Sequence, residues 1–257
     1  MRIVTWNVNS LNARMPRVEE WLRAVQPDVV CLQETKLADD AFPALAFESL
    51  GYSSTHHGQG QWNGVAILSR VGLSDPAVDF ADGGGADTDA RIVWATCGGV
   101  RIASAYVPNG RALDDDHYTY KLEWLARLRA HLDAALDPRD EVAVVGDFNI
   151  APSDVDVWDR RVFDGLTHVS EPERSAFESL LDWGMHDTLR ETHPDAEGLF
   201  TYWDYKAGRF HKREGMRIDH VLVTAPLRER LRWVMVDRNA RKGTKPSDHA
   251  PVVADFA

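Results

Sequence analysis

Short apolar segments rich in β-branched residues recur from one end of the chain to the other, and each has the length and composition of a buried strand. The segments are residues 3–8, 29–32, 65–68, 92–96, 102–107, 142–148, 218–223, 233–236 and 252–256. Because such runs are too short for core helices, the pattern predicts that strands supply much of the apolar core.

Helical periodicity fills several of the intervals between these segments. The clearest helix is predicted over residues 118–136, where leucines recur every three or four positions, and Pro138 marks its end. Its leucines are Leu122, Leu125, Leu128, Leu132 and Leu136. Further helices are predicted over 17–25 and over 173–183, the second ended by Gly184. Since strands and helices intermix along the whole length, we predict one α/β domain over residues 1–257, with layered sheets enclosed by helices.

Composition agrees with this class of protein. The chain has 257 residues, of which 44% are hydrophobic and 27% charged, as is typical of a globular protein with a sizeable core. No apolar run approaches the roughly 18 residues of a membrane span, and no basic leader precedes the first strand, so the cytoplasm is the expected location. Cys31 and Cys97 stand in apolar stretches and are predicted to be small buried hydrophobes rather than a disulfide or metal ligands.

The charge balance limits the ways in which this chain can contact nucleic acid. A formal charge of −11 at pH 7 argues against a protein that coats nucleic acid through a broad basic surface. Positive charge is gathered instead in two stretches, residues 206–217 and 238–245. These are either local contacts to a polyanion or two solvated loops, and charge alone does not decide between the two.

A consistent set of polar residues stands where predicted strands begin or end, and near the end of the chain. The set comprises Asn7, Glu34, Tyr106, Asp147, Asn149, Asp219, Asp248 and His249. Loops at strand ends are where a rigid scaffold commonly presents catalytic groups. Each residue alone is weak evidence, since an acid after a strand is usually a cap or a solvated turn. Glu34 and Asp147, however, leave buried strands where stray charge is costly, and a shared hard cation such as Mg²⁺ or Mn²⁺ would offset that cost.

Several short strings carry a resemblance to a known family. They are Thr5-Trp6-Asn7-Val8-Asn9, Leu32-Gln33-Glu34-Thr35-Lys36, Tyr106-Val107-Pro108-Asn109-Gly110, Gly146-Asp147-Phe148-Asn149, Arg217-Ile218-Asp219-His220 and Ser247-Asp248-His249. In this order, and over nearly the whole chain, they resemble the signature of exonuclease III and the related abasic-site endonucleases. The resemblance implies a DNase I-like fold, a four-layer sandwich of two packed mixed β-sheets flanked by helices.

The resemblance also implies a metal site. Glu34, assisted by Asn7, would hold Mg²⁺, for which Mn²⁺ is the expected substitute. Asp147, Asn149 and Asp248 complete the implied metal set. Asp147 would in addition orient or deprotonate the attacking water, and Asn149 would hydrogen-bond that water or the developing phosphorane.

The remaining implied catalytic residues face the phosphate. His249, held by Asp248, would touch a phosphate oxygen, with Asp219 supporting the same network. Tyr106 would contact the scissile phosphate or help the leaving oxygen. This set meets the needs of phosphodiester hydrolysis, which are an in-line water, a base and donors to the oxygens that gain charge. Whether Asp147 or His249 is the base stays open at this point, although we favour Asp147.

The metal and acid residues do not define the substrate, because this fold class also acts on inositol phosphates, lipids and messenger RNA. The segments 106–110 and 200–205 resemble the DNA-repair branch, in which aromatic surface beside positive charge suits an extruded nucleotide and its phosphates. The expected substrate-binding set is Asn109, Tyr202, Trp203, Met216, Lys212 and Arg213. Met216 stands where animal abasic-site endonucleases have a tryptophan, which leaves the balance of endonuclease to exonuclease action open.

The leading hypothesis is therefore a magnesium-dependent hydrolase that acts as a monomer on double-stranded DNA, especially abasic or 3′-blocked DNA. One alternative is a phosphodiesterase of the same fold that acts on lipids or inositol phosphates. A second is a DNA-binding module that has lost catalysis, which the intact Glu34, Asp147, Asn149 and His249 disfavour.

Overall fold

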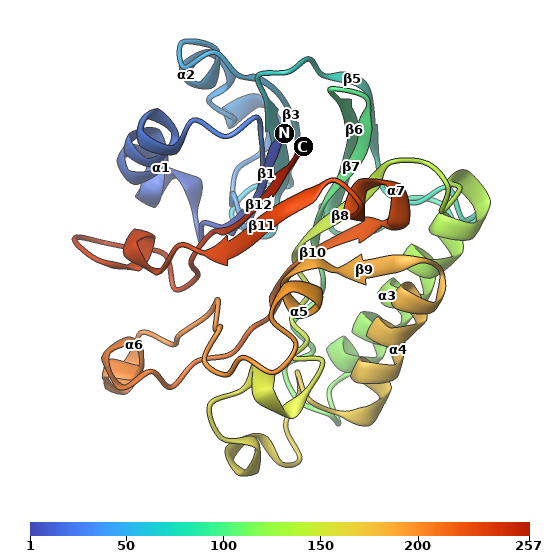
Figure 1. Cartoon of the computed structure of the whole chain (residues 1–257), viewed down its shortest axis with the longest axis vertical. Helices are drawn as coiled ribbons and strands as arrows, with labels where there is room; N and C mark the ends of the chain where they lie inside the picture. Colours follow the sequence, from blue (N-terminus) through green and yellow to red (C-terminus); the bar gives the residue numbers. More distant parts are fainter.

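Two six-stranded β-sheets lie face to face in the computed structural model, which describes residues 1–257 (Figure 1). The first sheet reads, in spatial order, β11 (Leu231–Val236), β12 (Val252–Phe256), β1 (Arg2–Asn7), β2 (Val29–Gln33), β4 (Val65–Ser69) and β3 (Ser53–His57). The second reads β5 (Ser74–Val78), β6 (Ile92–Cys97), β7 (Val100–Tyr106), β8 (Val142–Asp147), β10 (Asp219–Thr224) and β9 (Met185–Asp187). Each sheet contains a parallel pair, β1 with β2 and β7 with β8, among antiparallel neighbours, so both are mixed.

Helices cover the outer face of each sheet. The first sheet carries α1 (Leu11–Val25) and α2 (Ala44–Glu48), and the second carries α3 (Asp116–Ala135) and α4 (Glu171–Asp182) (Figure 1). The connections contain α5 (Thr188–Thr192), α6 (Arg209–Lys212), α7 (Ala225–Arg228) and the 3₁₀ turns η1 (Asp39–Ala41), η2 (Asp154–Asp156), η3 (Arg160–Phe163), η4 (Lys206–Gly208) and η5 (Arg238–Arg241). The predicted four-layer sandwich is confirmed.

Alternation along the strands separates the core into layers. On β2, Val29 and Cys31 belong to the apolar cluster between the two sheets, whereas Val30 and Leu32 pack under α1. A third cluster lies between the second sheet and the helices α3 and α4. Because both faces of each central strand are covered, these strands read in the sequence as nearly continuous apolar runs.

The predicted helices are present, but two of them begin at residues other than those predicted from the sequence pattern. Helix α4 begins at Glu171 because Ser170 and Glu173 form a capping box, two residues before the predicted start. Helix α1 begins at Leu11 rather than at residue 17, so Pro16 lies inside it. A proline within the second turn removes one backbone donor, and the helix tolerates that loss.

Three strands were absent from the prediction. β3 is polar and mostly half-buried, β5 is exposed throughout, and β9 has only three residues. All three lie at the edges of their sheets, where one side of the strand is unpaired and an apolar run is not needed.

The two ends of the chain lie together at one end of the first sheet (Figure 1). β1 pairs antiparallel with β12, Arg2 opposite Asp255, and the Phe256 amide donates to the Met1 carbonyl over 2.8 Å. β1 then runs away from this point to Asn7. The chain ends are therefore at the opposite end of β1 from the polar residues described below.

Two further sequence expectations concern the interior and the membrane. Cys31 and Cys97 are buried and free, as predicted. None of the helices has the length and apolar character needed to span a bilayer.

Candidate active site

The polar residues predicted from strand ends converge at one edge of the sandwich, between the two sheets. Asp219 lies directly opposite Asp147 in the β8–β10 ladder, and Tyr106 lies opposite Asp147 in the β7–β8 ladder. The Asn7 amide, at the end of β1 in the other sheet, donates to Asp147 Oδ2 over 2.9 Å. Strands that end or begin at one edge thus bring residues far apart in sequence into a single site.

Asp147, Asp219 and His249 form a buried cluster at the centre of this site. Each offers an atom within 4.8 Å of the others. His249 Nδ1 bonds Asp219 Oδ2 at 2.8 Å, and His249 Nε2 lies 3.8 Å from Asp147 Oδ2. The second oxygen of Asp219 is buried without a hydrogen-bond partner. A buried carboxylate oxygen of this kind is suited to a cation or to a donor on a substrate.

The protonation states follow from this geometry. Burial lowers the pKa of His249, but Asp219 and Asp147 outweigh burial and raise it to about 10, so the imidazole is charged at neutral pH. Burial raises the pKa of Asp147 to about 7, although His249 opposes the rise. A carboxylate whose pKa lies near 7 is a better general base than an ordinary aspartate, whereas a charged imidazole has no free lone pair to take a proton.

The partner of His249 differs from the prediction. Asp219, not Asp248, holds the imidazole. Asp248 accepts instead from Asn9 Nδ2 at 3.1 Å. The reason is topological: the β8–β10 pairing places Asp219 beneath the ring, a proximity that sequence adjacency does not reveal.

Glu34 lies at the same side-chain amide group of Asn7 as Asp147. Its backbone has φ 52°, and its Oε2 atom lies 2.8 Å from Lys36 Nζ. Burial would raise the pKa of Glu34, but Lys36 outweighs that effect and lowers it, so Glu34 is ionised. The two carboxylates, Glu34 and Asp147, are bridged by the same Asn7 amide nitrogen, which donates to both over 2.9 Å.

The structure describes the hydrogen bonds of Asn7, and its role as a metal ligand stays a prediction. Its Oδ1 accepts the Asn9 backbone N–H at 2.9 Å, and its NH₂ group points toward the carboxylates. The carboxylate oxygens of Glu34 and Asp147, which accept from one amide nitrogen, and the unpaired oxygen of Asp219 are a suitable donor set for a hard divalent cation.

Tyr106 lies in the same space. Burial raises the pKa of its phenol well above the usual value, and the charges of Glu34 and Asp147 raise it further. Tyr106 therefore keeps its proton and can only donate to an anionic oxygen. Arg91, which the sequence analysis did not select, lies over the Tyr106 ring at 5.0 Å and over Tyr120 at 5.7 Å. The signal in the sequence that could have identified Arg91 was its position directly before the predicted strand 92–96.

Asn149 and Asn109 form the next part of the site. Asn149 has φ 51°, and its backbone N–H donates to Asp147 Oδ1 at 2.9 Å. Its side-chain NH₂ donates to the Val107 carbonyl, and its Oδ1 accepts from Asn109 Nδ2 at 3.2 Å. The amide of Asn149 is thus held beside Asp147, and Asn109 is exposed at the rim.

An apolar pocket of about 180 Å³ adjoins this cluster. Isolated bridges pair Val157 with Met216, Met216 with Tyr202, and Tyr202 with His249, so these side chains form one row that starts at the catalytic histidine. The Tyr202 and His249 rings are 4.9 Å apart. The pocket is lined by Tyr202 and Met216, as predicted, and also by residues of one loop that the sequence analysis missed. These are Trp158, Val162, Phe163 and Leu166.

Trp203 was assigned wrongly to the pocket. It is 0% exposed and packs against Phe200, Ala250 and Phe210 in a separate apolar cluster. Tyr202 and Trp203 are neighbours in an extended segment, so their side chains point to opposite faces, and only Tyr202 reaches the pocket.

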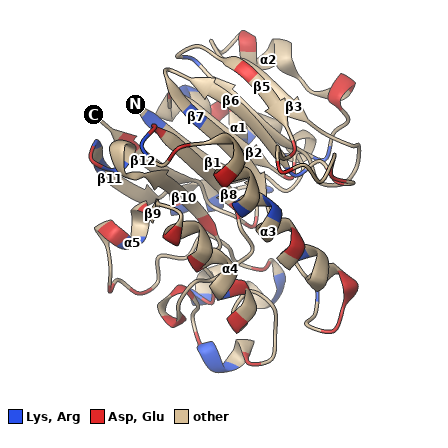
Figure 2. Cartoon of the chain, turned by 90° about the vertical axis from the view of Figure 1, so that its right-hand side faces the viewer, with Lys and Arg blue, Asp and Glu red and all other residues tan.

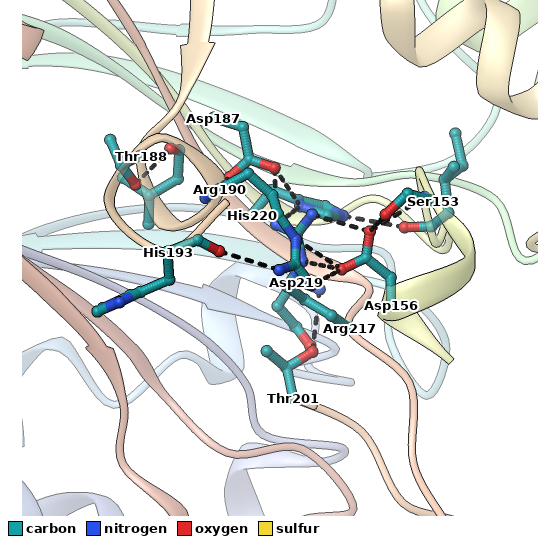
Figure 3. Close-up of polar contacts among 12 residues, drawn as sticks. Ser153, Asp156, Asp187, Thr188, Arg190, His193, Thr201, Arg217, Asp219 and His220 are labelled. Atoms are coloured by element: carbon teal, nitrogen blue, oxygen red, sulfur yellow. Dashed lines mark hydrogen bonds and ion pairs between the residues drawn. The ribbon is translucent and has the colours of Figure 1, made fainter. Parts of the chain in front are cut away.

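The basic stretch over residues 206–217 is only partly available to a ligand. Arg217 is fully buried, with Nε 2.6 Å from Asp156 and Nη1 2.7 Å from Asp187. Figure 3 shows Arg217 between these two carboxylates. Lys212 and Arg213 are exposed on α6 and just beyond it. By contrast, Asp and Glu residues recur along α3 and α4, in another part of the molecule (Figure 2).

A four-layer sandwich with carboxylates, amides and a histidine gathered between the ends of its two sheets is the architecture of the DNase I-like phosphoesterases. Comparison with known proteins leads to the same class and narrows it. Residues 4–249 match the model of the Endonuclease/Exonuclease/phosphatase family, and the chain belongs to this family.

Individual relatives narrow the class further. Exodeoxyribonuclease III of Haemophilus influenzae is 34% identical over 270 aligned residues, which cover 100% of both chains. An AP endonuclease from Archaeoglobus fulgidus is 35% identical and superimposes with a TM-score of 0.96 over 100% of this chain and 99% of that one. A 3′ phosphatase from Neisseria, solved with a product DNA hairpin, is 40% identical with a TM-score of 0.95 over the same shares. These relatives confirm the predicted enzyme class, a nuclease hydrolase.

Proposed function

We propose that this protein is a Mg²⁺-dependent DNA-repair phosphodiesterase that incises DNA 5′ to abasic sites and removes 3′ nucleotides and 3′ blocking groups. The observation that carries the proposal is the juxtaposition of the Asp147–Asp219–His249 cluster with the Tyr202–Met216 pocket. The relatives named above, one of them bound to DNA, support DNA as the substrate. We further propose that one domain, acting as a monomer in the cytoplasm, carries the whole activity.

The geometry assigns a role to each side chain around the phosphate. Asp147 orients the attacking water and accepts its proton, because its raised pKa suits a base near neutral pH. The charged His249, held by Asp219, donates to a phosphate oxygen and stabilises the negative charge that develops there. Tyr106, which keeps its proton, donates to the phosphate or to the leaving oxygen. Asn149 donates to the water or to the phosphorane.

Glu34 and Asp147, which accept from the same Asn7 amide nitrogen, would hold the divalent cation, and Asp248, bonded to Asn9, would complete the site. Mg²⁺ takes few protein ligands and keeps several waters, which matches this sparse set, and Mn²⁺ shares its preference for oxygen. When bound, the cation supplies Lewis-acid polarisation of the phosphate and charge for the leaving 3′ oxygen.

The apolar pocket is the proposed site of the bare sugar. An abasic nucleotide has no base stacking to lose, so its extrusion costs less than that of an intact nucleotide. The sugar then lies against Tyr202 and Met216, one residue along the row from His249. Lys212 and Arg213, beyond the far rim, and Asn109, beside Asn149, contact flanking phosphates.

One assay tests this proposal. End-labelled duplexes, either intact or with a single tetrahydrofuran site, are incubated with Mg²⁺ or with chelator, and the products are resolved by length. We expect a single cut 5′ to the tetrahydrofuran and stepwise 3′ shortening of the intact duplex, both only with Mg²⁺. Cleavage of a lipid or inositol phosphate in place of DNA, or full activity in excess chelator, overturns the proposal.

A further inference from the structure

The backbone that carries Asp147 and Asn149 accepts hydrogen bonds from basic side chains that take no part in the chemistry above. We call residues 147–151 the catalytic loop. The carbonyls of Asn149, Ile150 and Ala151, which are consecutive, each accept a hydrogen bond from a basic side chain of another segment. We propose that these basic side chains are positioning residues that hold the catalytic loop in the geometry needed for hydrolysis.

The Asn149 carbonyl accepts two of these hydrogen bonds. Lys121 Nζ, from α3, donates to it at 2.7 Å, and His168 Nδ1 bonds it at 2.6 Å. A carbonyl only accepts, so Nδ1 of His168 carries a proton.

Lys121 is itself held in place. Its side chain and that of Glu173, from α4, are both fully buried and form an ion pair at 2.5 Å. Glu173 also accepts from Thr167 Oγ1 and from the His168 backbone N–H at 2.8 Å. A buried pair of this kind adds little net stability compared with apolar packing, so its energetic benefit does not explain its presence. It does fix the direction of the Lys121 ammonium group.

The next two carbonyls are held from other elements. His220 Nε2, on β10, bonds the Ile150 carbonyl at 2.9 Å, and its Nδ1 lies 3.0 Å from Arg217 Nη1. Because Arg217 can only donate, Nδ1 of His220 accepts and Nε2 carries the proton. Arg217 and His220 are shown together in Figure 3. Arg174 Nε, on α4, donates to the Ala151 carbonyl at 3.1 Å.

The hydrogen bonds to the carbonyls restrain the position of Asn149 within the catalytic loop. Asn149 has φ 51°, in the left-handed region, which Asn adopts more readily than most non-glycine residues, so the backbone angle alone does not hold the loop in place. A shift of Asn149 would carry its N–H away from Asp147 Oδ1 and its side chain away from the Val107 carbonyl. Loss of the hydrogen bonds to the loop carbonyls would thus displace Asp147, the proposed base, together with the Asn149 amide, which is proposed to bind the water.

His168 offers a matched pair of substitutions. His168 has φ 79°, which Asn tolerates well, and an Asn side chain keeps an N–H donor near the position of Nδ1. His168→Ala removes the donor. On a tetrahydrofuran duplex with Mg²⁺ we expect His168→Ala to lower kcat about ten- to hundredfold with KM changed by less than about twofold, because the loop is misplaced but the pocket is not. We expect His168→Asn to keep kcat within about threefold of wild type.

Thr224→Val is the control for general destabilisation. Thr224 is buried at the other end of β10 and donates to the Asp140 carbonyl at 2.6 Å, so the substitution also removes a buried side-chain bond to a carbonyl. It should lower the melting temperature without lowering kcat. Hydrogen exchange adds a readout that does not depend on cleavage: the Asn149 amide should exchange faster in His168→Ala and not in Thr224→Val.

The choice of substrate in this test rests on the proposed function. The possible outcomes distinguish a failure of the inference from a failure of the proposed function. Failure of the wild type to cut the tetrahydrofuran duplex counts against the proposed function, and the exchange measurement still tests the loop. A folded His168→Ala enzyme with wild-type kcat and exchange overturns the inference, as does an equal loss of kcat in Thr224→Val. If His168→Ala does not fold, Arg174→Met, at a partly exposed position, takes its place. We expect Arg174→Met to lower kcat by a smaller factor. An unchanged kcat in this variant would contradict the inference.

Discussion

The catalytic loop and the segment beside the pocket are built in opposite ways. The catalytic loop leaves β8 in the interior, and its carbonyls accept hydrogen bonds from basic groups of α3, α4 and β10. The segment 205–214 is exposed over much of its length and projects from the sandwich at α6 (Figure 1). It is held mainly where Phe210 packs between the guanidinium groups of Arg238 and Arg241, at 5.2 and 5.0 Å.

This difference separates chemistry from selectivity. Groups that move protons and stabilise charge need positions fixed to a fraction of an ångström, and the interior supplies that restraint. Groups that select a substrate tolerate more variation, and surface loops supply it at little cost to the core. We therefore expect substitutions in the interior part to lower turnover, and substitutions beside the pocket to change which substrate is preferred.

The largest effect is expected at Asp147. Asp147→Asn removes the proposed base and should lower kcat by about 10²- to 10⁴-fold, the usual contribution of a general base. Excess Mg²⁺ or Mn²⁺ should not restore it. Glu34→Ala is the matched comparison, because loss of a metal ligand weakens cation binding and should be partly rescued by high metal concentration. Steady-state kinetics over a metal titration measures both, and equal rescue of the two variants would mean that the roles are misassigned.

The next effect concerns pH. The rate should fall as the pH drops below about 7, because Asp147 gains a proton, and should fall above about 10, because His249 loses one. Asp219 raises the pKa of His249, so Asp219→Asn should move the alkaline limb to lower pH and lower the maximum rate.

Asp248→Asn serves as the contrast for this measurement. Asp248 bonds Asn9 rather than the imidazole, so its substitution should leave the alkaline limb closer to its original position. Profiles of kcat against pH for the three proteins decide the matter. An alkaline limb that shifts in Asp248→Asn but stays in place in Asp219→Asn would favour the Asp248–His249 pairing predicted from the sequence.

A moderate effect is expected in the pocket. Met216→Ala with Tyr202→Ala should weaken incision at a tetrahydrofuran site while cleavage beside a normal nucleotide falls less, so the ratio of the two kcat/KM values should shrink by about tenfold. Trp203→Phe, within the buried cluster, is the control and should change stability without changing the ratio. Thermal melting reports folding for each protein. An unchanged ratio in a folded double variant would show that these side chains do not form the gate.

The smallest effect is expected from the exposed cations. Lys212→Ser with Arg213→Ser should raise KM several-fold, change kcat little and reduce the dependence of KM on salt, because each phosphate contact releases counterions. Lys206→Ser with Lys242→Ser, at two other exposed positions, gives a control of equal charge change. A defect confined to kcat would place Lys212 and Arg213 outside the DNA path.

Local signals in the sequence were sufficient to predict the fold class and to indicate residues that the structure brings together at one site. Apolar runs mark the central strands, and the polar residues at their ends mark the site. Asp147 and Glu34 are examples, since a charge directly after a buried strand is conspicuous in the sequence. Family resemblance then joined these separate positions into one active centre.

What the sequence did not reveal depends on contacts between distant segments. The Asp219–His249 bond follows from the β8–β10 pairing, and the burial of Arg217 follows from Asp156 and Asp187, which reach it from other segments. The inward turn of Trp203 is likewise set by the cluster around it. Neither Lys121 nor Glu173 shows its burial in the sequence, because each stands in an otherwise ordinary amphipathic helix.

The meeting of the two chain ends at the far side of the first sheet has a practical consequence for engineering. A short peptide linker from Ala257 to Met1 would need to cross very little space, since the Phe256 amide already bonds the Met1 carbonyl. New termini opened in the exposed loop around Gly72, which follows the end of β4 farthest from the catalytic edge, would yield a circular permutant with the same sheets. Such a permutant would free the original junction for immobilisation on a surface, with the DNA-facing edge directed away from it.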